Sequence, residues 1–161
     1  MSGPITIQQP RNDPGRWFSW AELTHSDLAA KRGWDNAPGI PEQAALVALV
    51  REVLDPLREL LGVPLRVTSG YRSPAVNLAA GSLPTSQHLL GEAVDVKAGG
   101  GMSSEEVVRR LAASALPADQ GIFYHPSRGG HVHVSHTTTR ANRRMFLCAH
   151  DGGGYVPWSS T

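Results

Sequence analysis

The sequence predicts an α+β fold in which helices pack on a small antiparallel sheet. An apolar stripe at helical spacing runs through residues 46–61, whereas residues 65–68 and 131–135 alternate between apolar and polar side chains as strands do. Helices come first and strands mixed with further helices follow, an order typical of α+β folds. With this length we expect a single domain over residues 1–161, whose residues 1–16 form an extended, proline-containing lead-in.

Local signals indicate where the helices begin and end. Ser19 and Glu22 have the spacing of a capping box, in which each side chain satisfies a backbone N–H group at the start of a helix. Pro41 suits the first turn of the long helix, and Gly62 suits its C-terminal cap. Pro56 lies inside this helix and should kink or interrupt it, because proline has no backbone N–H group to donate.

The composition and charge exclude several classes of protein. A formal net charge of +1 predicts no broad basic surface, so we expect no nucleic-acid partner. Neither a membrane-spanning run nor a signal peptide is visible, so we expect synthesis in the cytoplasm and no membrane association. We also expect a monomer. The local cluster of Arg140, Arg143 and Arg144 either contacts an anionic polymer or forms a solvated surface patch.

Histidines gather near the C-terminal end of the chain. Four of the seven lie between residues 125 and 136. On a strand, His131 and His133 share one face while Val132 and Val134 take the other. The two imidazoles therefore either face a common functional space or form a surface pair on a strand edge.

A second polar feature is Asp95, which interrupts an otherwise apolar strand. Ala93 shares its face, Glu92 should take the other face, and His88 ends the preceding loop. A buried carboxylate is costly unless a cation pairs with it. That cation is either a metal beside His88 or the guanidinium of Arg72.

Together the two segments offer two imidazole ligands and one carboxylate. This set leaves a fourth position for water, as in catalytic rather than structural zinc sites, and zinc suits a nitrogen-rich site. Such a metal lowers the pKa of water and polarises a carbonyl group, which favours hydrolysis of an amide or ester. Arg72 ends a turn before a helix start, where it could hold a carboxylate or an oxyanion, or simply lie on the surface.

Three segments, in this order, resemble the zinc D-Ala-D-Ala carboxypeptidase and L-alanyl-D-glutamate endopeptidase family. Residues 86–95 carry the complete pattern Ser-x-His-x-x-Gly-x-Ala-x-Asp. Residues 69–77 carry Ser-Gly-Tyr-Arg-Ser-Pro-x-x-Asn, and a later His-Val pair completes the set. The similarity extends over residues 18–155, so it covers most of the chain.

The resemblance implies that one zinc ion per chain is held by His88, Asp95 and His133. It implies that Arg72 stabilises the substrate carbonyl as negative charge develops, and that Ser86 helps to position the substrate. The implied activity is hydrolysis of a peptide bond in the stem peptide of bacterial peptidoglycan, by carboxypeptidase or endopeptidase action. The implied fold is similar to that of hedgehog and D-Ala-D-Ala peptidases and places zinc above the sheet. We expect the protein to reach the cell wall by phage-type lysis or virion-associated release.

One position departs from the family pattern. Many members place an acidic residue three positions before the last histidine ligand, as general base, and here that position is Gly130. His131 is the first candidate for the base because strand parity puts it beside His133, followed by His125 and then Glu92. The departure also keeps open an alternative, a catalytically impaired zinc-containing module that binds cell wall or has a structural role in a phage.

An enzyme of another class is a further alternative. Cys148 is the only cysteine, and it lies two residues before His150. A thiol nucleophile with a histidine base would need these two side chains to meet. The apolar run around Cys148 is instead typical of a buried strand.

Overall fold

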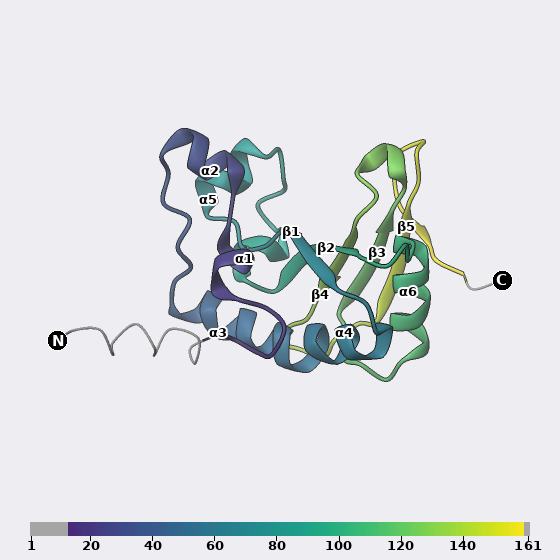
Figure 1. The fold of residues 1–161 in the computed structure, drawn as a ribbon. Coiled ribbons are helices and arrows are strands. Elements are labelled where there is room, and N and C mark those ends of the chain that lie inside the picture. Colours follow the sequence, from purple (N-terminus) through teal and green to yellow (C-terminus); the bar gives the residue numbers. More distant parts are fainter. Residues whose placement is uncertain (1–12, 160–161) are drawn as a thin grey trace.

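The computed structural model describes residues 13–159, and Figure 1 shows their arrangement. Helices come first and strands mixed with further helices follow, as expected for an α+β protein. The elements are α1 (Trp20–Thr24), α2 (Asp27–Arg32), α3 (Ile40–Leu49), the π-helical segment η2 (Val50–Leu54), α4 (Asp55–Leu61), β1 (Leu65–Ser69), α5 (Pro74–Ala79), the 3-10 turn η3 (Gln87–Leu90), β2 (Ala93–Ala98), α6 (Ser104–Ala113), β3 (Gln120–Tyr124), the 3-10 turn η4 (Pro126–Arg128), β4 (Val132–Ser135), β5 (Met145–Ala149) and β6 (Val156–Pro157).

The strands form a six-stranded sheet in the order β1-β2-β4-β3-β5-β6. The α+β prediction is confirmed, but the expectation of a purely antiparallel sheet is wrong at one place, because β3 and β5 pair in parallel. β3 and β4 are antiparallel neighbours, and β5 joins the other edge of β3. The chain after β4 therefore crosses beside the start of β3, and β5 runs in the same direction as β3. Alternation within a strand carries no information about the direction of its neighbour.

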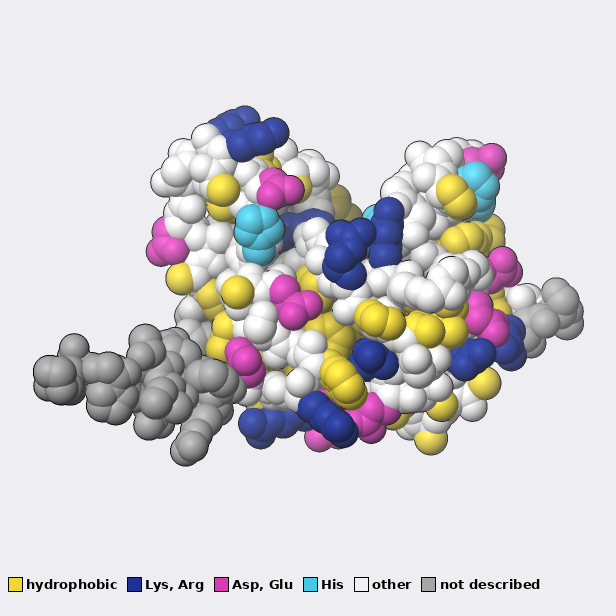
Figure 2. Space-filling view, in the orientation of Figure 1, with side chains coloured by type: hydrophobic (Ala, Val, Ile, Leu, Met, Phe, Trp, Pro, Cys, Tyr) yellow, Lys and Arg dark blue, Asp and Glu magenta, His cyan; other side chains and the backbone are white. Residues whose placement is uncertain are grey.

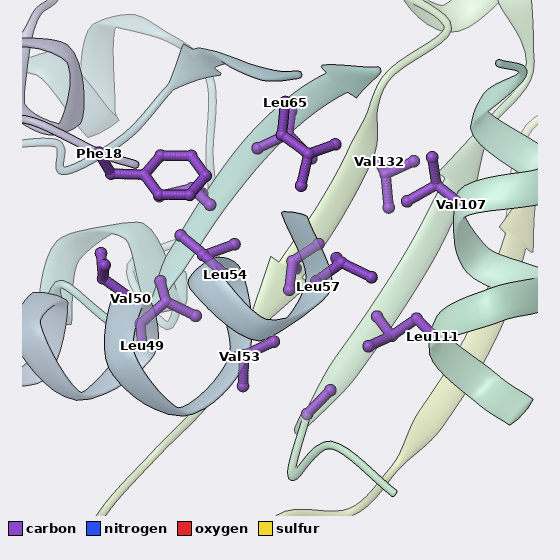
Figure 3. Close-up of a cluster of buried hydrophobic side chains, with 14 of the residues drawn as sticks. Phe18, Leu49, Val50, Val53, Leu54, Leu57, Leu65, Val107, Leu111 and Val132 are labelled. Atoms are coloured by element: carbon purple, nitrogen blue, oxygen red, sulfur yellow. The ribbon is translucent and has the colours of Figure 1, made fainter. Parts of the chain in front are cut away.

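One face of the sheet forms the core against α3, η2, α4 and α6. Figure 3 shows buried side chains of these helices in one cluster with Val132 of the sheet, among them Leu57 and Leu111. Each such side chain contributes about 1.5–3 kcal/mol when it is removed from water. Four valines of β2 and β4 on this face are fully buried: Val94, Val96, Val132 and Val134. Strand alternation therefore directs Asp95 and His133 to the opposite face.

The long helix is interrupted before Pro56, as the sequence predicts. The N–H group of Asp55 donates to the carbonyl of Val50, five residues back, so the turn between them is widened. α4 then begins at Asp55, which leaves Pro56 in its first turn, where the missing N–H group does no harm. Gly62 ends α4 in the left-handed conformation, with a φ of 69°.

The predicted extended lead-in lies largely outside the described residues, which begin at Asp13. Its last part is fixed to the start of α4, because the carboxylate of Asp55 accepts from the N–H groups of Arg16 (2.6 Å) and Trp17 (3.1 Å). The capping box of Ser19 and Glu22 then starts α1 as predicted. Among residues 13–159, none of the helices is both long and apolar enough to span a bilayer.

Candidate metal centre

Two neighbouring strands bring Asp95 and His133 together. They are direct partners across the antiparallel pair β2 and β4, so their side chains leave the sheet on the same face. Asp95 Oδ1 lies 3.3 Å from His133 Nδ1. The valine pattern fixes the face, because a shift of one residue would turn Asp95 toward the helices and the valines toward the opposite face.

His88 approaches the same carboxylate oxygen from the turn η3. Ser86 caps this turn, and its Oγ accepts from the N–H group of His88 at 3.3 Å. His88 is almost fully buried, and its Nδ1 lies 2.7 Å from the carbonyl oxygen of Gly70. A carbonyl only accepts, so Nδ1 carries the proton and Nε2 presents its lone pair. Nε2 lies 3.4 Å from Asp95 Oδ1.

Glycine is required at position 70 for this contact. A Cβ atom there would lie 2.0 Å from the carbonyl oxygen of Leu23, far inside van der Waals contact. The adjacent N–H group of Tyr71 donates to the same Leu23 carbonyl at 2.8 Å. The chain at Gly70 therefore lies in close contact with both α1 and His88. Its carbonyl orients the imidazole, as hydrogen-bond partners of metal-binding histidines do.

The three side chains fit a metal ion by their mutual spacing. His88, Asp95 and His133 each offer one ligand atom, and these atoms all lie within 4.8 Å of one another. Ligand atoms about 2.1 Å from a tetrahedral zinc ion stand about 3.4 Å apart. The two distances to Asp95 Oδ1, 3.3 and 3.4 Å, agree with this spacing. Two nitrogens and one oxygen are also the donor set of a catalytic rather than a structural zinc site.

The other oxygen of Asp95 faces a guanidinium and a further imidazole. Oδ2 lies 3.5 Å from Arg72 Nη2 and 3.8 Å from His131 Nε2. The position of Asp95 is thus compatible with both cationic partners that the sequence suggested. One is a metal ion beside His88, and the other is the guanidinium of Arg72. Burial opposes ionisation of Asp95, but His88 and His133 outweigh it and hold the pKa of this carboxyl well below its usual range.

Arg72 is held in a defined orientation at the edge of the centre. Its Nε donates to Ser69 Oγ at 3.1 Å and its Nη1 donates to Ser82 Oγ at 2.9 Å. Its backbone N–H group donates to the carbonyl of His88 at 3.2 Å. The guanidinium is therefore positioned beside the candidate ligands rather than free on the surface.

Gly130, the position at which the resemblance led us to expect an acidic base, has a backbone that favours glycine. Its φ is +62°, a left-handed conformation that favours glycine over residues with a side chain. His131, the first alternative base, lies on the cleft side and stacks on Tyr124 with 4.3 Å between ring centroids. Burial lowers the pKa of His131, although Asp95 opposes the shift, so its neutral form is favoured.

The other two candidate bases lie elsewhere. His125 is partly buried and caps η4, with its Nδ1 accepting from the N–H group of Ser127 at 3.2 Å. Glu92 is buried and accepts from Thr137 Oγ1 at 2.5 Å. Within the part of the chain that the structure describes, neither residue lines the cleft that contains Asp95.

The candidate metal centre lies in an open cleft of about 640 Å³. Figure 2 shows the surface hollowed between the part that carries α2 and α5 and the part formed by the ends of β3 and β5. Arg72, Ser86 and His131 all line it. Among its other lining residues, Gln120, Tyr124 and Tyr155 were not singled out from the sequence. Alternation in residues 120–124 puts Gln120 and Tyr124 on one face, but only the sheet shows which face.

The cysteine alternative finds no support. Leu147 lines the cleft, so strand alternation directs its neighbour Cys148 to the other side of β5. Burial raises the pKa of the Cys148 thiol, and Glu105 adds to the effect, which disfavours the reactive thiolate.

The arginine cluster is neither a simple solvated patch nor wholly free for a polymer. Arg140 and Arg143 both pair with the buried carboxylate of Asp119. Arg144 instead donates to the carbonyls of Ala112, Ser114 and Leu116 near the end of α6.

Comparison with known proteins agrees with this geometry. No curated protein matches the chain. The Peptidase M15 family model matches residues 16–135, which include Arg72 and all three candidate ligands. A peptidase acts on a peptide substrate, and the cleft with its His-His-Asp cluster is the place in this fold where such a substrate meets a possible metal site. The chain therefore belongs to the Peptidase M15 family.

Proposed function

We propose that this protein is a zinc metallopeptidase that hydrolyses a peptide bond in the stem peptide of bacterial peptidoglycan. The observation that carries the proposal is the convergence of His88 Nε2 and His133 Nδ1 on Asp95 Oδ1, at 3.4 and 3.3 Å. These three side chains would hold one zinc ion per chain. When bound, zinc would polarise the substrate carbonyl and lower the pKa of water.

The remaining residues around the centre have complementary tasks in this reaction. Arg72 donates hydrogen bonds to the substrate carbonyl oxygen as negative charge develops on it. Ser69 and Ser82 keep the guanidinium in place before the substrate arrives, so little reorganisation is needed during the reaction. Ser86 lies on the cleft wall, where it positions the peptide and also caps the turn that carries His88.

His131 is the proposed general base. It accepts the proton of the attacking water and passes it to the leaving amine. Its lowered pKa keeps the imidazole neutral and able to accept a proton near neutral pH. The stack on Tyr124 fixes the ring beside Asp95.

A second candidate function is a zinc-containing wall-binding or phage structural module without activity. The observation that favours it is Gly130, whose left-handed backbone has no acidic side chain to offer. It predicts metal binding without hydrolysis.

The deciding experiment measures zinc content and hydrolysis on the same preparation. We expect about one zinc per chain by elemental analysis, and release of new amino groups from purified peptidoglycan that a chelator abolishes and added zinc restores. Zinc without amino-group release would favour the non-catalytic module. A protein without zinc that still cleaves the wall would contradict the proposed mechanism.

A further inference from the structure

The cleft has a direction set by β3. Alternation along this strand puts Gln120, Ile122 and Tyr124 on the cleft face, and all three line the cleft. Ile122 pairs with His133, so it marks the row of the candidate metal ligands. At about 3.3 Å per residue, Gln120 and Tyr124 lie about 7 Å to either side of that row. A peptide crossing the centre along β3 would therefore reach Gln120 about two residues from the bond to be cut.

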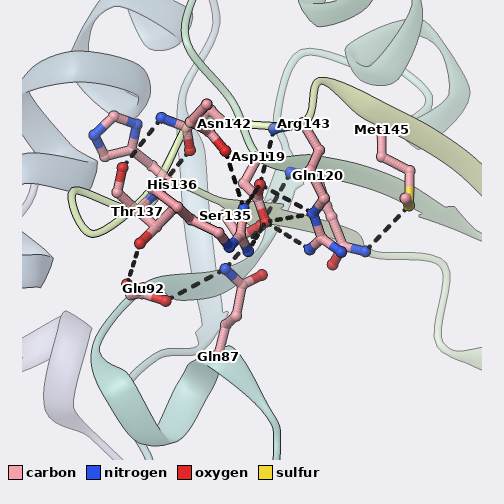
Figure 4. A network of polar contacts seen from close by, with 12 residues as sticks. Gln87, Glu92, Asp119, Gln120, Ser135, His136, Thr137, Asn142, Arg143 and Met145 are labelled. Atoms are coloured by element: carbon pink, nitrogen blue, oxygen red, sulfur yellow. Dashed lines mark hydrogen bonds and ion pairs between the residues drawn. The ribbon is translucent and has the colours of Figure 1, made fainter.

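The Gln120 end of the cleft is built around a buried carboxylate. The side chain of Asp119 is completely inaccessible and accepts from two arginines, as Figure 4 shows for Arg143. Arg143 Nη2 donates to Oδ2 at 2.6 Å, and Arg140 Nη1 donates to Oδ1 at 2.6 Å. Burial opposes ionisation of Asp119, but the two arginines outweigh it and hold its pKa well below the usual range. Glu92 also acts on the charge of Arg140, so two carboxylates balance the two arginines in this network.

Of these two arginines, Arg143 faces the cleft. It is among the residues that line it together with Gln120, whereas Arg140 is not. Asp119 fixes Arg143 through its backbone N–H group (2.9 Å) as well as through Nε and Nη2. These bonds leave Nη1 for another acceptor.

The backbone beside Arg143 is also constrained. Arg144 has a φ of +51° and is the one residue other than glycine with a positive φ among those that the structure describes. This conformation costs about 1 kcal/mol or more, and it persists where surrounding contacts hold it. Hydrogen bonds from the Arg144 guanidinium to the carbonyls of Ala112 and Ser114 do so. The turn that presents Arg143 to the cleft is therefore rigid.

We propose that Arg143, with the amide of Gln120 beside it, forms a subsite for a carboxylate of the peptide substrate. The proposal rests on the proposed function and extends it to substrate selection. A guanidinium oriented by a buried carboxylate binds a second carboxylate through charge-assisted hydrogen bonds without first losing side-chain freedom. The recognised group lies about two residues from the bond to be cut. In a stem peptide it is either the α-carboxylate of the glutamyl residue or the C-terminal carboxylate.

The test uses one synthetic pentapeptide, L-alanyl-γ-D-glutamyl-L-lysyl-D-alanyl-D-alanine, in three forms. One form has both carboxylates free, one carries an amide at the glutamyl α-carboxyl, and one carries an amide at the C-terminus. The readout is kcat/KM where the zinc-loaded protein cleaves the peptide and Kd by calorimetry where it does not. We expect one of the two amides to lower kcat/KM or to raise Kd by about 10- to 100-fold. That amide identifies the recognised carboxylate.

Two matched variants separate recognition from structure. Arg143→Gln and Arg140→Gln each remove one cation from Asp119, but only Arg143 lines the cleft. Arg143→Gln should bind or cleave the free acid equally as well as the amide that the wild-type protein disfavours. Arg140→Gln should keep the wild-type preference for the free acid over that amide. Arg143→Lys should restore part of it, because lysine keeps the charge but not the planar fork.

Several outcomes would overturn the subsite. Equal kcat/KM or Kd values of the wild-type protein for all three peptides would contradict the subsite. If the peptides were nevertheless cleaved, the proposed function would still hold without the subsite. Equal loss of preference in Arg140→Gln and Arg143→Gln would assign the effect to the Asp119 cluster rather than to contact with Arg143. Preference for the free acid that depends on Arg143, without cleavage of any form, would support the subsite and contradict the proposed function.

Discussion

Asp95 and His133 are direct cross-strand partners although 38 residues separate them, and Asp95 Oδ1 lies 3.3 Å from His133 Nδ1. The same oxygen lies 3.4 Å from His88 Nε2. A metal ion shared by the three side chains would depend most on this carboxylate, which both imidazoles face.

Asp95→Asn should therefore lower zinc affinity by more than about 100-fold, because loss of an outer partner of a ligand alone costs 10- to 100-fold. The amide has the same shape but no charge. Asp27→Asn, at an exposed site on α2, should leave the affinity unchanged. Competition with a chromophoric chelator measures both. Equal zinc affinity in Asp95→Asn and wild type would remove Asp95 from the ligand set.

His131→Gln should lower kcat by about 10²- to 10⁴-fold, because it removes the proposed general base. Zinc content should stay near one per chain, since His131 is not a proposed ligand. His125→Gln is the matched control, because His125 caps η4 and does not line the cleft. Steady-state kinetics on a stem peptide with parallel metal analysis checks both variants. If His125→Gln were the impaired one, the assignment of the base would be reversed.

Arg72→Ala should lower kcat by about 10²- to 10³-fold with little change in zinc content, because it removes a donor to the developing oxyanion. Lysine should rescue poorly, since one ammonium group cannot contact both Ser69 and Ser82 as the guanidinium does. Arg66→Ala, on the exposed side of β1, serves as control. A rise in KM with unchanged kcat would instead give Arg72 a role in ground-state binding only.

Stability should fall in acid in a way that depends on Asp119. In the folded state the pKa of Asp119 is held below the value of about 3.9 that an aspartate has in an unfolded chain. As the pH falls, the unfolded state therefore binds more protons than the folded state. The stabilisation is present above about pH 5 and is lost progressively below about pH 4. Asp119→Asn should cost about 2 kcal/mol at pH 7 and flatten the acid limb. Urea unfolding at several pH values measures this, and an unchanged acid limb would contradict it.

Gly130→Ala should destabilise the fold by about 1 kcal/mol, because a φ of +62° is strained for a residue with a Cβ atom. Gly99→Ala is the control: it has no positive φ, and a Cβ there would make only ordinary contact, 3.4 Å from Pro64. Chemical denaturation compares the two. Equal stability of Gly130→Ala and wild type would mean that the backbone does not explain the missing acidic residue.

The sequence determined the local features of this protein. The apolar stripe predicted the long helix and Pro56 its interruption, since both depend on hydrogen bonds within a few residues. Strand alternation placed Asp95 and His133 opposite the core valines. The motif around His88 and Asp95 identified the family together with the segment at residues 69–77 and the later His-Val pair, because each pattern is short and local.

Only the tertiary structure decided which distant segments meet. The parallel direction of β5, the pairing of Asp95 with His133 and the clamp of Asp119 on Arg143 all join residues far apart in sequence. Such contacts depend on strand register and direction, which are fixed by packing of the whole sheet rather than by any short pattern. For the same reason Arg143 could be placed in a basic cluster from the sequence, but its position on the cleft wall could not.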